Sequence, residues 1–261
     1  MKYIANGKIN LDLQIKFKRK DGYHDLMTHM SEITFGDEIE ISEANKDTLV
    51  CNEFSIRRDN LMIKALERFR RDFFAPPQEI ILKKKLPIGG GLGGGSSDAA
   101  VMLKHLASTY KPDISKEEMF DIAKDIGMDV SFFLFNSPSK AALCYGRGEL
   151  VEPVDSEECQ VLIVFNHASL SKDVYKFVKP KIGRYSRYTN DLKEPAFLAN
   201  KKLKQFYEYL LSFDKDFRLS GAGGSFYLIG EKDELKLIKD KIDAKFSVIT
   251  NVYLPISYLK G

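Results

Sequence analysis

The sequence predicts an α+β protein of two domains, and three observations support this prediction. Apolar and polar residues alternate at 2–17, which is typical of a strand. A strand pattern at 79–83 leads through a glycine-rich loop into a helical pattern, and a second helical pattern follows it instead of the next strand of a βαβ unit. An apolar strand pattern restarts at 161–165. We therefore expect one domain at 1–150 and another at 151–261.

Composition and charge narrow the class of protein. Hydrophobic residues make up 44% and charged residues 30% of the 261 residues, as in an ordinary globular protein. Lysines and arginines (40) nearly balance aspartates and glutamates (37) and are spread along the chain, so we expect no nucleic-acid partner. Neither a run of about 18 apolar residues nor a signal-peptide pattern occurs, so we expect no membrane segment.

Cysteine and histidine spacing argues against metal and disulfide sites. Cys51, Cys144 and Cys159 are odd in number and lack C-x-x-C spacing, and the four histidines form no ligand pattern with them. We therefore expect neither a disulfide framework nor a zinc site, and this cysteine usage fits a reducing cytoplasm.

The alternation at 2–17 assigns residues to the two faces of the first strand. One face carries Ile9, Leu11, Leu13, Ile15 and Phe17, and the other carries Lys8, Asn10, Asp12, Gln14 and Lys16. Lys8 and Asn10 therefore project from the same side. A single lysine on a strand is ordinarily exposed to solvent, and the sequence alone leaves that interpretation open.

Turn and cap residues predict the elements that follow. Asp21 and Gly22 form a strong hairpin signal. Tyr23 and His24 come next, and by themselves they could simply pack at the start of a strand. We expect a strand at 34–41 and a helix at 60–69, with Asn60 as its N-cap.

The segment 86–100, LPIGGGLGGGSSDAA, contains six glycines between positions 89 and 95. Each glycine costs roughly 0.5–1 kcal/mol relative to alanine in a regular element, so the cluster requires a reason. Backbone N–H groups at a helix N-terminus, free of side chains, suit a polyphosphate. We expect Ser96 or Ser97 to cap the helix and to contact phosphate oxygens or phosphate-bound Mg²⁺. The alternative is a flexible surface turn, which the position between strand and helix disfavours.

Two common phosphate motifs do not describe this loop. The Walker A pattern fails because no lysine follows the glycines. Gly89, Gly91 and Gly94 satisfy G-x-G-x-x-G, but the second helical pattern after the loop is not the next strand of a dinucleotide-binding unit. A dinucleotide-dependent oxidoreductase is therefore a distant alternative.

The second helical pattern runs over 115–126, with Ser115 and Glu118 in capping-box spacing. Asp129 then precedes an apolar segment, where a carboxylate is usually a helix cap. A strand and glycine turn are expected at 141–149. In the second half we expect a helix at 171–178, a helix opening after 190–192, a helix at 201–213, and a second glycine loop at 219–226 that leads into a strand.

Three motifs occur in the order found in the GHMP kinases: GKINL at 7–11, GGGLGGGSSDA at 89–99 and SGAGGSF at 220–226. The sequence resembles this family over nearly its whole length. The resemblance implies a ribosomal-protein-S5-like N-terminal domain, a ferredoxin-like C-terminal domain, an active site between them, and ATP and Mg²⁺ as cofactors. The chain departs from the family pattern at positions that leave local backbone or side-chain contacts in doubt, namely Gly7, Met128, Ser131, Ala222 and Gly224.

The resemblance also implies roles for individual residues. GMDVSFFL resembles the family's GADVPFFL, which makes Asp129 the catalytic aspartate and places Lys8 beside it. The implied ATP-binding residues are Asn60, Lys84, Pro87, Gly89, Gly90, Gly91, Leu92, Gly93, Gly94, Gly95, Ser96 and Ser97. For Asn60 a pure capping role, and for Lys84 a solvated position at a strand end, are the alternatives.

One motif narrows the substrate within the family. DGYHDL at 21–26 resembles the DGYHEL segment with which GHMP kinases of diphosphocytidyl substrates hold cytosine. Tyr23 and His24 are thus implied to bind the base, with Tyr175 as a second aromatic, although Tyr175 could equally be a packing residue. Asn10 is implied to bind the methylerythritol end of the substrate.

The expected reaction is ATP-dependent phosphorylation of the 2-hydroxyl of diphosphocytidyl-methylerythritol, in the non-mevalonate route to isoprenoid precursors. A cytoplasmic monomer or homodimer, with this small molecule as its partner, is expected. The alternatives are another GHMP kinase, such as homoserine or mevalonate kinase, and a nucleotide-binding regulatory protein with a decayed site. Tyr23 and His24 argue against the first, and the presence of Lys8 and Asp129 argues against the second.

Overall fold

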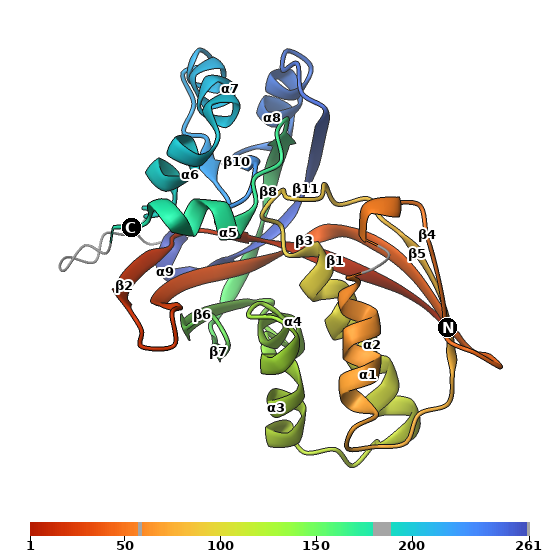
Figure 1. Ribbon diagram of the computed structural model, residues 1–261. Coiled ribbons are helices and arrows are strands. Elements are labelled where there is room, and N and C mark those ends of the chain that lie inside the picture. Colours follow the sequence, from red (N-terminus) through yellow and green to blue (C-terminus); the bar gives the residue numbers. More distant parts are fainter. Residues whose placement is uncertain (57–58, 180–188, 260–261) are drawn as a thin grey trace.

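A computed structural model describes residues 1–56, 59–179 and 189–259 (Figure 1). Within these residues the strands form one mixed sheet in two parts. The first part contains β1 (Lys2–Asn10), β2 (Gln14–Lys18), β3 (His24–Glu43), β4 (Thr48–Cys51), β5 (Gln78–Lys83), β6 (Ala141–Gly146) and β7 (Leu150–Pro153). The second part contains β8 (Ser156–Phe165), β9 (Arg218–Leu219), β10 (Ser225–Ile229) and β11 (Phe246–Pro255).

The long strand β3 is the centre of the first part. It pairs antiparallel with β1, β2, β5 and β6, while β4 adds to β5 in parallel. In the second part β8 lies between β10 and β11. The two parts meet where Val252 of β11 pairs with Ile33 of β3. The middle of β3 therefore lies where the two halves of the chain come together.

The helices divide between the two parts of the sheet. On the face of the first part lie α1 (Leu61–Phe69), α2 (Gly94–Tyr110), α3 (Lys116–Ile126) and α4 (Val130–Phe135) (Figure 1). The remaining helices are α5 (Ser171–Val174), α6 (Lys193–Ala199), α7 (Lys201–Leu211), α8 (Lys232–Lys239) and α9 (Ile256–Leu259), with 3₁₀ turns at Phe54–Ile56 and Tyr175–Phe177. No helix among the described residues is long and apolar enough to cross a bilayer.

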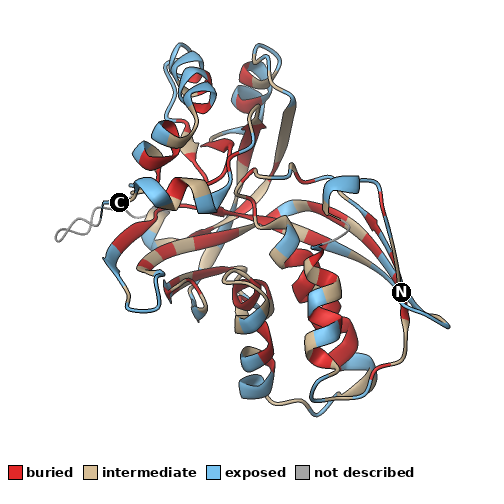
Figure 2. Cartoon of the chain, in the orientation of Figure 1, coloured by how far each residue is buried: buried red, intermediate tan, exposed pale blue. Residues whose placement is uncertain are grey.

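Helix α2 is the most buried helix of the first part. Figure 2 shows it buried over most of its surface, whereas α3 and α7 expose one side. It packs against α1, α4 and β1. The glycine loop leads directly into α2. Because neighbouring elements hold α2 on several sides, the end of the loop that joins the helix is held in place.

Several predicted elements are confirmed. Asn60 caps α1 by accepting a hydrogen bond from the Met62 N–H at 2.8 Å. Ser115 and Glu118 form a reciprocal capping box at the start of α3. The Asp21–Gly22 turn joins β2 and β3 as a hairpin. Of the helix predicted at 171–178, only Ser171–Val174 is α-helical, and a 3₁₀ turn continues it.

The prediction of one continuous strand at 2–17 is wrong. The chain leaves the sheet between β1 and β2, where the Leu13 N–H donates to the Thr189 carbonyl in the second half of the chain. A register shift between Ile15 and Phe17 then breaks the alternation, because an extra residue in one strand moves the following side chains to the other face. Phe17 is 55% exposed as a result.

The prediction that Ser96 or Ser97 caps the loop helix is also wrong. Helix α2 begins at Gly94, so both serines lie in its first turn. The N-cap is Gly93, which has a positive φ of 70° and no side chain to donate or accept a hydrogen bond. The serine hydroxyls therefore remain available for other partners.

Candidate active site

A cavity of about 320 Å³ lies where the two halves of the chain meet. Its wall combines residues from β1 and β3, the glycine loop, the start of α4, the β6–β7 turn, and the segments around Tyr175 and Gly221. The predicted site residues in this wall are Lys8, Asn10, Gly91, Gly93, Ser96, Asp129 and Tyr175. The structure thus brings together residues that are far apart in the sequence.

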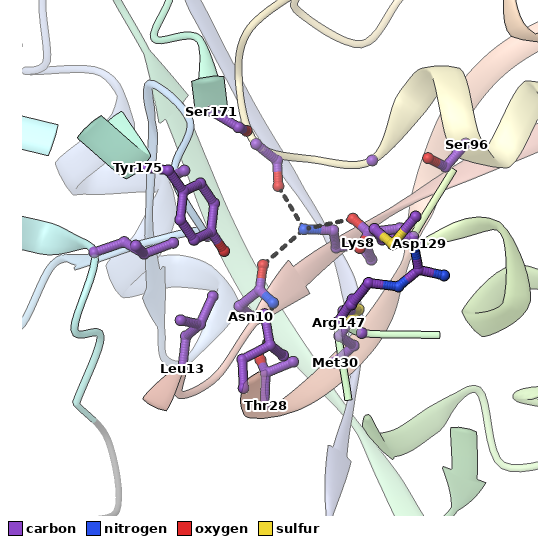
Figure 3. A pocket seen from close by; sticks show the side chains of 18 residues that line it. Lys8, Asn10, Leu13, Thr28, Met30, Ser96, Asp129, Arg147, Ser171 and Tyr175 are labelled. Carbon is purple, nitrogen blue, oxygen red and sulfur yellow. Dashed lines mark hydrogen bonds and ion pairs between the residues drawn. The ribbon is translucent and has the colours of Figure 1, made fainter. Parts of the chain in front are cut away.

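Lys8 is buried at the end of β1 and its ammonium lies inside the cavity wall (Figure 3). It donates hydrogen bonds to Asn10 Oδ1 at 2.6 Å and to the Gly91 carbonyl at 2.9 Å. Its Nζ also lies 3.4 Å from Asp129 Oδ2. A solvated lysine is therefore not what the structure shows, because three acceptors from three segments surround this ammonium.

Asp129 occupies the N-cap position of α4 but makes no side-chain capping bond. Its carboxylate points instead into the cavity, toward Lys8 (Figure 3). The side chain is 28% exposed, so a ligand can reach it. A carboxylate that leaves its own helix uncapped and faces a cavity beside a buried ammonium can act as a general base.

Asn10 is held in place by a chain of hydrogen bonds. Its Nδ2 donates to Thr28 Oγ1 at 2.9 Å, and that hydroxyl donates to the Asp12 carbonyl at 2.5 Å. This chain leaves Oδ1 directed at Lys8. Asn10 therefore orients the Lys8 ammonium, and hydrogen bonds on both sides hold the Asn10 side chain in place in the cavity wall.

Part of the glycine loop packs against the second glycine loop. A Cβ at Gly91 would lie 2.3 Å from the Ser220 carbonyl, and one at Gly223 would lie 2.0 Å from the Gly91 nitrogen. The Ser225 and Gly224 N–H groups donate to the carbonyls of Gly90 and Gly89. These glycines allow two backbones to touch, which the sequence interpretation of the loop as a ligand cradle did not include.

The other end of the loop faces the cavity. Gly93 has a positive φ, and a Cβ there would lie 3.1 Å from Lys8 and Phe133 side-chain atoms. Ser96, in the first turn of α2, also lines the cavity. The positive end of α2 thus lies close to Lys8, and with the Ser96 hydroxyl on the same cavity wall it can receive an anionic group.

Other predicted nucleotide residues have structural partners. Leu92 is buried, and its carbonyl accepts from the Lys8 N–H at 2.9 Å. The Pro87 carbonyl accepts from the Gly90 N–H at 3.1 Å. Ser97 is buried in the first turn of α2. None of these lines the cavity, nor do Asn60, Lys84, Gly89, Gly90, Gly94 and Gly95.

Lys84 is buried and is not solvated. Its ammonium bonds Asp98 Oδ2 at 2.8 Å and also bonds Asp37. Burial acts to lower the pKa of Lys84, but the two carboxylates outweigh it and raise that pKa. Burial raises the pKa of Asp98 to about 7, with Lys84 opposing and Asp37 adding to the rise. The geometry gives Lys84 a role inside the fold, behind the glycine loop.

The predicted base-binding aromatics lie next to one another. His24 and Tyr175 stack with ring centroids 5.3 Å apart and an interplanar angle of 26°. Tyr23 is half exposed and lies against the Arg147 guanidinium at 5.1 Å. Burial, and then Lys18, lower the pKa of His24, while burial and Asp129 raise the pKa of Tyr175. Tyr175 lines the cavity, whereas His24 and Tyr23 lie next to residues of its wall without lining it.

The sequence interpretation missed several residues of the wall. Arg147 lines the cavity from the β6–β7 turn, and Thr28 and Met30 line it from β3. The sequence offered one possible signal for Arg147, because it is a charged residue between two glycines in a predicted turn, and binding residues often lie on loops. Thr28 and Met30 offered no such signal.

Known proteins are similar to this chain in sequence. Residues 60–137 match the model of the GHMP kinases N terminal domain. A 4-diphosphocytidyl-2-C-methyl-D-erythritol kinase from Francisella tularensis is 33% identical over 258 residues, which are 93% of this chain and 92% of that protein. The chain belongs to this family of GHMP kinases. A protein of the same name from Chlamydia caviae is 34% identical over 247 residues, covering 87% of this kinase and 83% of the relative.

Solved structures share the fold of this kinase. A crystal structure of 4-(cytidine 5'-diphospho)-2C-methyl-D-erythritol kinase matches with a TM-score of 0.79 and 25% identity, over 97% of this chain and 99% of that one. A mevalonate kinase matches with a TM-score of 0.64 and 14% identity, over 98% and 99%. The GHMP kinase fold predicted from the sequence is therefore confirmed.

Proposed function

We propose that this kinase transfers the γ-phosphoryl group of ATP to the 2-hydroxyl of 4-diphosphocytidyl-2-C-methyl-D-erythritol, in the non-mevalonate route to isoprenoid precursors. The observation that carries the proposal is the cavity in which Asp129 faces Lys8 beside the end of the glycine loop. Phosphoryl transfer depends mainly on positioning and on stabilising charge, and this arrangement offers both.

Two residues would perform the central step. Asp129 would accept the proton of the substrate hydroxyl, since its carboxylate is exposed to the cavity and makes no capping bond. Lys8, fixed by Asn10 and the Gly91 carbonyl, would orient Asp129 and meet the negative charge of the γ-phosphate. Both side chains come from rigid elements, so their separation is set by the fold.

The glycine loop would receive the phosphates of ATP. Gly93 and Ser96 lie at the positive end of α2, where backbone N–H groups and a hydroxyl face the cavity. Asn60 and Lys84 would support the nucleotide site indirectly. Asn60 caps α1, and Lys84 forms the ion pairs behind the glycine loop.

Mg²⁺ fits the oxygen donors of this wall. No cluster of three His, Cys, Asp or Glu side chains suited to a metal occurs among the described residues. Mg²⁺ commonly takes only one or two protein ligands and completes its shell with phosphates and water. Ser96, whose hydroxyl lies on the cavity wall, would be such a ligand here. When bound, the ion would neutralise phosphate charge during transfer.

The aromatic wall supports a substrate that carries a pyrimidine. Tyr175 lines the cavity, His24 stacks on its ring, and Tyr23 lies against Arg147, another residue of the cavity wall. Homoserine and mevalonate have no aromatic group that would use them. The same proposal places the enzyme in the cytoplasm as a monomer or homodimer.

A coupled ADP-release assay with Mg·ATP tests the proposed function. Diphosphocytidyl-methylerythritol, homoserine, mevalonate and galactose would be compared at equal concentration. We expect turnover only with the cytidine-bearing substrate. Turnover with another of these alcohols, or with none, would overturn the substrate assignment while leaving the family assignment intact.

A further inference from the structure

Arg147 is a cation of the cavity wall that the reaction described above does not use. It lies in the turn between β6 and β7, and its side chain extends along the wall beside Asp129 (Figure 3). The adjacent Gly148 also lies near this carboxylate, since a Cβ there would be 3.8 Å from Asp129 Oδ1. Arg147 therefore belongs to the part of the wall where a substrate hydroxyl would meet its base.

Two contacts fix the Arg147 side chain. Its Nε donates to Glu149 Oε1 at 3.0 Å, and its backbone N–H donates to Glu149 Oε2 at 2.6 Å. The guanidinium also lies over the Tyr23 ring, 5.1 Å from its centroid. Within the described part of the chain, no hydrogen-bond acceptor is recorded for the two terminal nitrogens. Arg147 is therefore held in place through its Nε, and its two terminal guanidinium nitrogens can donate hydrogen bonds to a ligand.

The second cation of the cavity wall, Lys8, already has partners for its ammonium. Lys8 has Asn10, Gly91 and Asp129 around its ammonium, and Asp129 is itself an anion. Arg147 is therefore the lining cation with free donors. A fork of this kind matches the oxygens of a phosphate or diphosphate, which accept two parallel hydrogen bonds.

The position of Arg147 indicates which phosphates it binds. It contacts Tyr23 in the β2–β3 turn, next to His24, and its side chain also lies beside Asp129 (Figure 3). It therefore lies between the aromatic residues expected to hold a base and the carboxylate expected to take the hydroxyl proton. In the substrate, the diphosphate occupies that same place between base and acceptor alcohol.

We propose that Arg147 binds the diphosphate of the acceptor substrate through its two terminal guanidinium nitrogens. This inference rests on the proposed function, because it assumes a ligand with a pyrimidine at one end. It assigns Arg147 to acceptor binding and specificity, with Glu149 as the residue that positions it. The nucleotide donor does not depend on Arg147.

Titration calorimetry with CDP and with cytidine tests the inference. For Arg147→Gln we expect CDP to bind roughly 10- to 100-fold more weakly, because a charge-assisted hydrogen-bonded contact is lost. Cytidine, which has no phosphate, should lose much less affinity than CDP, with any loss arising from the contact of Arg147 with the Tyr23 ring. Arg147→Lys, which keeps the charge but loses the fork, should fall between the two. Arg19→Gln is the matched control, since Arg19 lies in the same turn region and pairs with Asp21 and Asp25.

The outcomes separate the inference from the proposed function. An unchanged ratio of CDP to cytidine affinity in Arg147→Gln, or an equal loss in Arg19→Gln, would overturn the role of Arg147 alone. A wild-type protein that binds neither ligand would overturn the proposed function and the inference together. In steady-state assays, a raised KM for the acceptor with an unchanged KM for ATP supports the inference, whereas a raised KM for ATP alone contradicts it.

Discussion

Two lysine–aspartate clusters lie on either side of the glycine loop, and they differ in access. The open cluster consists of Lys8 and Asp129, whose charged atoms are 3.4 Å apart at the edge of the cavity. The closed cluster consists of Lys84, Asp37 and Asp98, whose side chains are 5%, 0% and 2% exposed. The residue types are the same, so charge alone does not decide which cluster can react.

The closed cluster holds the entry to the glycine loop. Asp37 Oδ1 accepts from the N–H groups of Lys85 and Leu86 at 2.6 and 2.8 Å, while Oδ2 meets Lys84. Asp98 ties the same lysine to the first turn of α2. The cluster thus joins the end of β5 to the helix on the far side of the loop. Its side chains are almost completely buried, so a substrate has no access to them.

The open cluster has the opposite character. The Asp129 carboxylate is partly exposed and makes a looser contact with its lysine. A substrate hydroxyl can approach it without breaking a buried ion pair, which would cost several kcal/mol. The comparison indicates that access to the cavity distinguishes the pair that can react from the buried cluster that holds the loop.

The largest expected effect is on turnover when the open cluster loses its base. Asp129→Asn should lower kcat by roughly 10²- to 10⁴-fold, because a general base is removed. Its free energy of unfolding should fall by about 1–3 kcal/mol, because the change removes the anion beside the buried Lys8 ammonium although it removes no helix cap. Steady-state kinetics and urea unfolding measure the two quantities, and near-normal turnover would contradict the proposed mechanism.

A stability effect is expected when the closed cluster loses its cation. Lys84→Met leaves two carboxylates buried without a counterion and should reduce the free energy of unfolding by roughly 3–5 kcal/mol. Urea unfolding measures this loss. Lys83→Met is the matched control, because Lys83 is 64% exposed and its pair with Glu38 is worth at most about 1 kcal/mol. Equal effects of the two changes would contradict the structural role of Lys84.

The smallest expected effect is a pH dependence of stability from Asp98. Its pKa is about 7 in the folded protein, above the ordinary value of about 3.9, so the folded state holds this proton more tightly. The stabilisation from that proton is complete below about pH 4 and is lost as the pH rises through about 7. The unfolding free energy of wild type minus that of Asp98→Asn should therefore fall between about pH 4 and about pH 7. A difference that is constant or rises would contradict this assignment.

The fold was largely predictable because its local signals are strong. The capping residues Asn60 and Ser115 and the Asp21–Gly22 turn mark their elements through short-range chemistry, and each was confirmed. Phe17 was assigned to the wrong face because a bulge depends on the partner strand, which periodicity does not reveal.

The site was less predictable because it depends on contacts between distant segments. Lys8 and Asp129 were paired only through the family resemblance, since nothing in their local sequence links them. The glycines at 89–91 were assigned to a ligand, although they also allow contact with the loop at 220–225. Lys84 and Lys83 look alike in the sequence, and only the fold shows that one is buried and the other is not.

The central claim is that the open cluster performs the chemistry and the closed cluster maintains the loop. The most direct test measures kcat with Mg·ATP and diphosphocytidyl-methylerythritol for Asp129→Asn and Asp98→Asn, with urea unfolding of both at two pH values. The account predicts that Asp129→Asn loses most of its turnover and that Asp98→Asn, when folded, keeps it, while the difference in unfolding free energy between wild type and Asp98→Asn changes with pH. A loss of turnover in folded Asp98→Asn as large as that in Asp129→Asn would contradict the claim.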